Sequence, residues 1–177
     1  MSPIALRPLI DKSVSMPLFA KLLLLFNVGS LLFAWTMQYG FGILPCYLCI
    51  WERIPFASVA VLSLLMLLWK PYGKQTFALL GLCVLVYLGS AVLAFYHSGV
   101  EWLWWEGTQG CEALPLQGSS PEEIRQALLQ AQEPRCDVVP WSIFGLSLAN
   151  LNVLGSLALA FITALAAKKA KTSASTK

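Results

Sequence analysis

Four of the five cysteines in this sequence fall into two pairs that could exchange electrons with other thiols. Cys46 and Cys49 form a Cys-x-x-Cys motif, whereas Cys111 and Cys136 lie much farther apart. A Cys-x-x-Cys motif is typical of thiol–disulfide exchange, in which a thiolate attacks a disulfide. A structural disulfide usually closes a longer loop, because so short a loop gains little chain entropy. We therefore interpret Cys46 and Cys49 as a redox pair.

Two structural interpretations of the same cysteines compete with this one. Four cysteines can bind zinc tetrahedrally, but the spacing of the second pair does not form a zinc knuckle, so we predict no metal site. Two disulfides that only staple loops together are the other alternative. The resting pairing stays open here, because four cysteines allow three pairings. Cys83 lies alone in an apolar run and is interpreted as a packing residue without a chemical role.

Arg53 and the single histidine, His97, are the polar side chains that could assist this chemistry. Arg53 follows Cys49 by four positions, so a helix that begins near Pro45 places both on one face. A helix that begins at Pro55 would instead leave Arg53 in the loop before the helix, where its position relative to Cys49 is not set by helical spacing. A nearby cation lowers the pKa of a thiol, and an imidazole can donate a hydrogen bond to a carbonyl ligand. Each residue alone would more often be an ordinary interfacial side chain.

The composition predicts that membrane helices position these residues. Of the 177 residues, 58% are hydrophobic and 12% are charged, whereas a soluble domain has about 25% charged residues. A helix of roughly 20 apolar residues crosses a bilayer core of ~30 Å, and uninterrupted apolar runs exclude a barrel pattern. We expect an all-α membrane protein that forms a single domain over residues 1–177. Its four transmembrane helices are predicted at 18–38, 54–69, 76–95 and 143–167.

The distribution of charge predicts the orientation of this four-helix bundle. Nine of the twelve basic residues precede the first helix or lie in its first turn, lie in the 70–75 loop or lie in the 168–177 tail. The positive-inside rule places these segments, and therefore both termini, in the cytoplasm. The loops at 39–53 and 96–142 then lie outside, and they contain all four paired cysteines. Disulfides persist in that compartment, so the lysines and the cysteines indicate the same topology.

The second outer loop contains the sequence signature of a short helix. Ser120 can cap it, Pro121 suits its first position and Glu123 completes a capping box. An apolar stripe follows, formed by Ile124, Ala127, Leu128 and Ala131. We predict that this helix lies on the outer leaflet beside nearby tryptophans, although packing against the bundle fits the periodicity equally well.

In combination, these features resemble the DsbB family of disulfide-forming membrane proteins. The resemblance covers about residues 18–167, and its motifs occur in the family order. They are Pro45-Cys46-Tyr47-Leu48-Cys49, Glu52-Arg53, His97 and the two loop cysteines. The stretch formed by Cys136-Asp137, Phe144-Gly145-Leu146-Ser147-Leu148-Ala149 and Asn152 looks like the shorter branch of the family.

The resemblance implies a quinone-dependent protein-disulfide oxidoreductase of the bacterial inner membrane, with periplasmic redox loops. Its implied partners are membrane lipid and a periplasmic DsbA-type thioredoxin-fold oxidase, with no nucleic acid. The oxidase would attack a Cys111–Cys136 disulfide, Cys136 would exchange with Cys46, and Cys49 would reduce ubiquinone or menaquinone. Arg53 and His97 would bind the quinone oxygens. The activity would support disulfide bond formation in secreted proteins.

Two alternative functions remain at this level. A vitamin K epoxide reductase-like enzyme also combines four helices, cysteines and quinone. In that family the loop cysteines precede the Cys-x-x-Cys motif, whereas here they follow it. A non-catalytic membrane adaptor with two stapling disulfides is the alternative from another class of protein.

Overall fold

The computed structural model describes residues 16–108, 111, 120, 122, 125 and 134–175. The helix predicted after Ser120 lies outside the described residues, apart from isolated positions. Within the described ranges, four helical segments are long and apolar enough to span a membrane. The prediction of an all-α bundle with four transmembrane helices is therefore confirmed.

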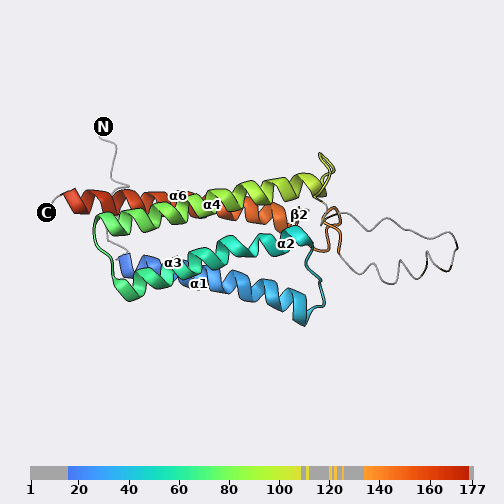
Figure 1. The fold of residues 1–177 in the computed structure, drawn as a ribbon, viewed down its shortest axis with the longest axis horizontal. Coiled ribbons are helices and arrows are strands. Elements are labelled where there is room, and N and C mark those ends of the chain that lie inside the picture. The colour runs from blue at the N-terminus through green and yellow to red at the C-terminus, as the bar shows by residue number, and fades with distance from the viewer. Residues whose placement is uncertain are drawn as a thin grey trace, which may run out of the picture.

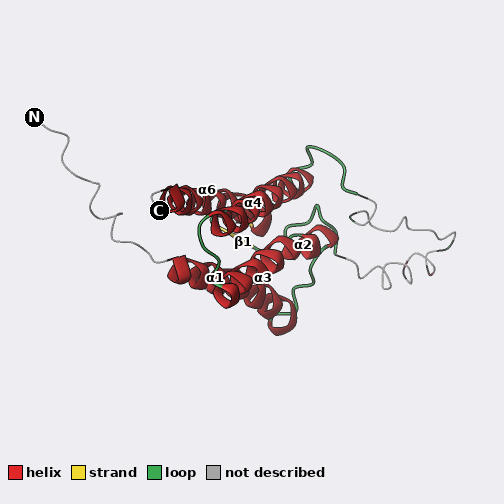
Figure 2. Ribbon diagram, turned by 60° about the vertical axis from the view of Figure 1, so that its left-hand side comes forward, coloured by secondary structure: helices red, strands yellow, loops and turns green. Residues whose placement is uncertain are grey.

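The helices form two antiparallel pairs (Figures 1 and 2). One pair combines α1 (Met16–Trp35), which continues into the π-helical turn η1 (Thr36–Gly40), with α3 (Arg53–Trp69). The other pair combines α4 (Lys74–Glu101) with α6 (Leu148–Ser175). The short helix α2 (Tyr47–Trp51) precedes α3, and contacts between α3 and α4 join the two pairs.

Small and apolar side chains fill the space between the helices, whereas many leucine and phenylalanine side chains face outward. Polar side chains in this core bond across helices, because a polar group that is unpaired in an apolar interior is costly. The Asn27 amide of α1 donates to the Tyr87 hydroxyl of α4 over 2.7 Å. Ser156 of α6 donates to Ser90 of α4 over 3.1 Å. These bonds fix how the helices are rotated toward one another.

The helices begin and end at positions that differ from the expected spans. Residues Ser142–Ile143 (β1) and Leu146–Ser147 (β2) pair as a small antiparallel hairpin, so α6 begins at Leu148 rather than at 143. The turn contains Phe144 and Gly145 with φ values of 51° and 80°, which a right-handed helix excludes. The Ser147 hydroxyl accepts the backbone N–H of Asn150 and so caps α6. The membrane borders themselves stay predictions.

Gly99 provides a test of packing near the outer end of α4. A Cβ atom at this position would lie 2.0 Å from the ring of Trp105, whose indole N–H donates to the Tyr96 carbonyl. We expect Gly99→Ala to lower the free energy of unfolding by about 1–3 kcal/mol, because the ring must move. Gly89→Ala in the same helix meets nothing within 4 Å and serves as the control. Thermal unfolding in detergent measures both, and equal midpoints would contradict this packing.

Candidate redox site

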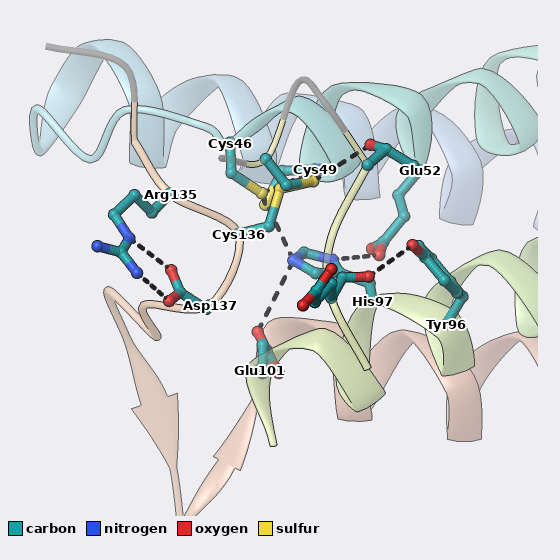
Figure 3. The surroundings of a disulfide bond; sticks show 12 residues. Cys46, Cys49, Glu52, Tyr96, His97, Glu101, Arg135, Cys136 and Asp137 are labelled. Atoms are coloured by element: carbon teal, nitrogen blue, oxygen red, sulfur yellow. Dashed lines mark hydrogen bonds and ion pairs between the residues drawn. A yellow bond between two sulfur atoms is a disulfide. The ribbon is translucent and has the colours of Figure 1, made fainter. Parts of the chain in front are cut away.

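The structure brings the four paired cysteines together at one end of the bundle. Cys46, Cys111 and Cys136 belong to a single buried cluster, against which Cys49 packs. Cys111 and Cys136 form a disulfide with a Cα–Cα distance of 5.0 Å. Cys46 and Cys49 are free thiols, and Figure 3 shows Cys136 beside both of them. Two pairs that are distant in sequence are therefore placed where they can exchange bonds.

Helix α2 sets the geometry of the free pair. Cys46 is its N-cap residue, and the Cys46 sulfur accepts the backbone N–H of Cys49 at 3.3 Å. The two Sγ atoms are 2.9 Å apart. The hydrogen bond from the Cys49 thiol lowers the pKa of Cys46, the backbone bonds of the helix start add to this effect, and burial opposes it. Cys46 is therefore the more acidic thiol of the reduced pair and the first to give up its proton.

This assignment predicts a difference between two substitutions at Cys49. Cys49→Ala removes the side-chain donor, whereas Cys49→Ser keeps an O–H donor at the same place. We expect the pKa of Cys46 to be higher in Cys49→Ala than in Cys49→Ser. The measurement is the rate of iodoacetamide alkylation at Cys46 as a function of pH, read by mass spectrometry. Identical midpoints in the two variants would show that the Cys49 side chain does not stabilise the thiolate.

His97 is buried and lies against the Cys46 sulfur. Its Nε2 atom is 3.5 Å from Cys46 Sγ, and its Nδ1 atom is 2.7 Å from Glu52 Oε1. A carboxylate at Nδ1 favours the tautomer that carries a proton there, which leaves Nε2 able to accept the thiol proton. Glu101 Oε1 is 4.0 Å from Nε2 and adds a second negative charge. The imidazole is thus arranged to hold a proton beside Cys46.

Glu52 is a buried carboxylate with partners on two other helices. Its Oε2 atom accepts the Asn152 amide of α6 at 2.8 Å, and Asn152 in turn accepts from Ser156 at 2.9 Å. In the sequence, Glu52 stands out only as part of the DsbB-like motif, and no role was predicted for it. The signal was present, because an ionisable residue within an apolar segment beside a Cys-x-x-Cys motif is a functional candidate.

A largely apolar cavity of about 330 Å³ opens beside Cys49, between α1, α3 and α6. Its polar lining residues are few and include Cys49, Glu52, Arg53 and Asn152. The Arg53 guanidinium donates to Gln38 Oε1 at 2.8 Å, which ties α3 to the η1 turn. The volume falls within the range of about 300–1,000 Å³ that is common for small-molecule sites. An apolar ring with a few polar atoms fits such a cavity.

A second cavity, of about 270 Å³, lies on the other side of Cys49. Its lining includes Cys46, Cys49, Glu52, His97 and Glu101. The structure thus places Arg53 and His97, which the sequence argument had grouped at one ligand, beside different cavities. His97 is not among the residues that line the larger cavity. Helix α2 begins directly after Cys46, so Cys49 and Arg53 do line one cavity, as the early helix start predicts.

The zinc alternative fits this geometry poorly. The ligand atoms of Cys46, Cys49 and His97 lie within 4.8 Å of one another, which is close enough for a metal ion. Two thiolates on a tetrahedral zinc with Zn–S bonds of ~2.3 Å are roughly 3.8 Å apart. The 2.9 Å between the sulfurs is closer to a dithiol that is ready to form a disulfide. Cys111 and Cys136 are bonded to each other, so a four-cysteine site is excluded in this state.

This chain is similar to known proteins over most of its length. The family model described as Disulfide bond formation protein DsbB matches residues 17–166. Disulfide bond formation protein B of Xylella fastidiosa (strain 9a5c) is 30% identical over 154 residues, which cover 83% of this chain and 87% of that relative. The protein of the same name from Azoarcus sp. (strain BH72) is 30% identical over 140 residues, with 75% and 80% covered.

An uncharacterized protein of Rickettsia prowazekii (strain Madrid E) is 28% identical over 139 residues, with 77% of this chain and 79% of that relative covered. No solved structure matches the chain significantly. The family match includes both cysteine pairs and most of each of the four segments that are long and apolar enough to span a membrane. The chain therefore belongs to the DsbB family of multi-pass membrane proteins, disulfide oxidoreductases that act in disulfide bond formation.

Proposed function

We propose that this protein reoxidises a periplasmic DsbA-type dithiol oxidase and passes the electrons to a membrane quinone. One observation carries the proposal: Cys49 lines the apolar cavity, whereas its partner Cys46 lies in the buried cluster with Cys111 and Cys136. The Cys-x-x-Cys pair therefore faces a second disulfide on one side and a site for an apolar ring on the other. The four cysteines act in sequence from the outside partner to the membrane.

The first step exchanges electrons with the partner. A thiolate of the reduced oxidase attacks the Cys111–Cys136 disulfide at Cys111, and Cys136 leaves as a thiolate. The second thiol of the oxidase then displaces Cys111, which leaves both loop cysteines reduced and the oxidase oxidised. A cavity of about 400 Å³ beside Cys111, lined by Trp104 and Trp105, supports access to this sulfur.

The second step moves the electrons inward. The Cys136 thiolate attacks an oxidised Cys46–Cys49 disulfide at Cys46, and Cys49 leaves as the thiolate that faces the larger cavity. Cys111 then displaces Cys46 from the mixed disulfide, which restores the loop disulfide and leaves Cys46 and Cys49 reduced. The described state, with one disulfide and two free thiols, corresponds to the end of this step.

The third step uses the larger cavity. A quinone bound there supplies an acceptor for two electrons and two protons. Cys49 would lie against its ring, and Arg53 would stabilise negative charge that develops on its oxygen. Apolar side chains from α1, α3 and α6 exclude water from the ring. The Cys46–Cys49 disulfide then forms again, ready for the next cycle.

The positions of the lysines support a periplasmic face for the cysteine end. Lys168, Lys169 and Lys171 lie in the last turns of α6, and Lys74 begins α4. These positions are at the end of the bundle opposite α2 (Figure 1). The positive-inside rule places that end, with both termini, in the cytoplasm.

Turnover with defined components tests the proposed function. Purified protein is mixed with a reduced DsbA-type oxidase and with either ubiquinone-1 or a short-chain menaquinone. We expect oxidation of the partner that depends on the quinone, and the faster of the two quinones identifies the class that this protein uses. Absence of partner oxidation with both quinones would contradict the proposal.

A further inference from the structure

Glu52 occupies the boundary between the two cavities beside the Cys-x-x-Cys pair. Among the described residues, Cys49 and Glu52 are the two titratable residues that line both cavities. Glu52 is buried at 9% exposure, and its two carboxylate oxygens have different partners. One accepts from Asn152, and the other meets the His97 imidazole. The carboxylate is thus held in place between the histidine and the apolar cavity.

The chemistry of the third step requires proton transfer as well as electron transfer. Oxidation of a dithiol breaks two S–H bonds, forms one S–S bond and releases two electrons and two protons. Reduction of a quinone to a quinol consumes two electrons and two protons. Cys49 lines the larger cavity and can give up its proton there, but Cys46 does not line it. The proton of Cys46 therefore needs a carrier.

The contacts around Cys46 provide a continuous path to the larger cavity. Cys46 Sγ lies 3.5 Å from His97 Nε2, and His97 Nδ1 lies 2.7 Å from Glu52 Oε1. An imidazole that gains a proton at one nitrogen can release a proton from the other. The charged or titratable groups that face this path are Cys49 of α2, Arg53 of α3, Glu101 of α4 and Arg135 of the segment before β1. Arg135 is paired with Asp137. Helix α6 contributes the neutral Asn152.

We propose that Glu52 is a catalytic proton carrier, which takes the Cys46 proton from His97 and delivers it into the larger cavity. His97 accepts the proton at Nε2 and releases its Nδ1 proton to Glu52. Glu52 then donates that proton to an acceptor oxygen of the quinone, while the second proton comes from Cys49. Two protons and two electrons leave the dithiol and two of each arrive, so the step balances. The inference rests on the proposed function, because it requires a proton-accepting quinone in this cavity.

Single-turnover kinetics test the transfer. Protein reduced at Cys46 and Cys49 is mixed without oxygen with whichever of ubiquinone-1 and the short-chain menaquinone supports the faster turnover, and quinol formation is followed by absorbance. Glu52→Gln keeps the size of the side chain but cannot carry a proton, and we expect a loss of about 10²–10⁴-fold in rate. Glu52→Asp keeps a carboxylate and should recover part of the rate. Glu101→Gln removes a carboxylate near the same histidine but outside the larger cavity, and its loss should be much smaller.

A second measurement separates proton transfer from a structural role and needs no quinone. The oxidised-minus-reduced infrared spectrum of the quinone-free protein should contain a carboxyl band that Glu52→Gln loses and that Glu101→Gln keeps. A Glu52→Gln rate within threefold of wild type, a Glu52→Asp rate as low as that of Glu52→Gln, or the band persisting in Glu52→Gln would each overturn the inference. Failure of the wild type to form quinol would instead overturn the proposed function.

Discussion

Cys49→Ser should abolish quinone-dependent turnover while leaving the first exchange with the partner intact. Cys49 is the member of the Cys-x-x-Cys pair that lines the apolar cavity, so a serine there cannot form the disulfide or pass electrons onward. Loss of a covalent catalytic group can cost roughly 10⁴–10⁶-fold in rate, and we expect turnover to fall by at least about 10⁴-fold. The measurement is the rate of partner oxidation in the presence of a quinone, monitored through the loss of partner thiols.

The same variant keeps the Cys111–Cys136 disulfide, so a reduced DsbA-type oxidase should still form a mixed disulfide with it, visible on a non-reducing gel. Cys83→Ala is the matched control, because Cys83 is buried in the α4 core and belongs to a separate cluster from the paired cysteines. Its turnover should stay close to wild type. A Cys49→Ser protein that turns over at a measurable fraction of the wild-type rate would mean that electrons leave by another group.

Arg53→Gln should impair the quinone step selectively. The guanidinium lines the larger cavity and is oriented by Gln38, so it is placed to stabilise charge on a quinone oxygen. Removal of one such donor typically costs about 10²–10³-fold in rate, and we expect a loss of that order in kcat/KM for the quinone. The rate of thiol exchange with the partner should not change, because the partner step does not involve this cavity.

Lys74→Gln removes the same charge at the opposite end of the bundle and controls for net charge. Steady-state kinetics with varied quinone, run beside exchange kinetics with the partner, measure both steps. Equal losses in Arg53→Gln and Lys74→Gln would mean that Arg53 acts only through the overall charge. A loss in the partner step alone would place Arg53 outside the quinone site.

The apolar runs were sufficient to predict the bundle, and the positions of the cysteines predicted that both pairs lie at one end of it. An even number of crossings places the two outer loops at one end, so Cys46 and Cys136 had to lie on the same side. The contact between Glu52 and His97 was not predictable in this way. The His97 imidazole and the Glu52 carboxylate are 45 positions apart in sequence, and their contact depends on how α4 is rotated about its axis. No local pattern in the sequence specifies that rotation.

The hairpin before α6 was missed for a different physical reason. Ile143, Phe144 and Leu146 are apolar and continue the hydrophobic run of the last helix, so periodicity assigned them to that helix. Phe144 adopts a left-handed backbone conformation that bulky residues rarely take. The residue types in this segment therefore do not predict a turn at Phe144. The Ser147 hydroxyl bonds Glu101, which attaches this turn to the end of α4 beside His97. Tertiary contacts outweighed the local preference here.

In the proposed cycle, electrons leave the Cys46–Cys49 dithiol for a quinone. The most direct measurement counts thiols and quinol in one anaerobic turnover, with partner protein absent and with Cys111 and Cys136 still oxidised. We expect one quinol to form for each Cys46–Cys49 disulfide that appears in mass mapping. Disulfide formation without quinol, or quinol formation with both thiols retained, would contradict it.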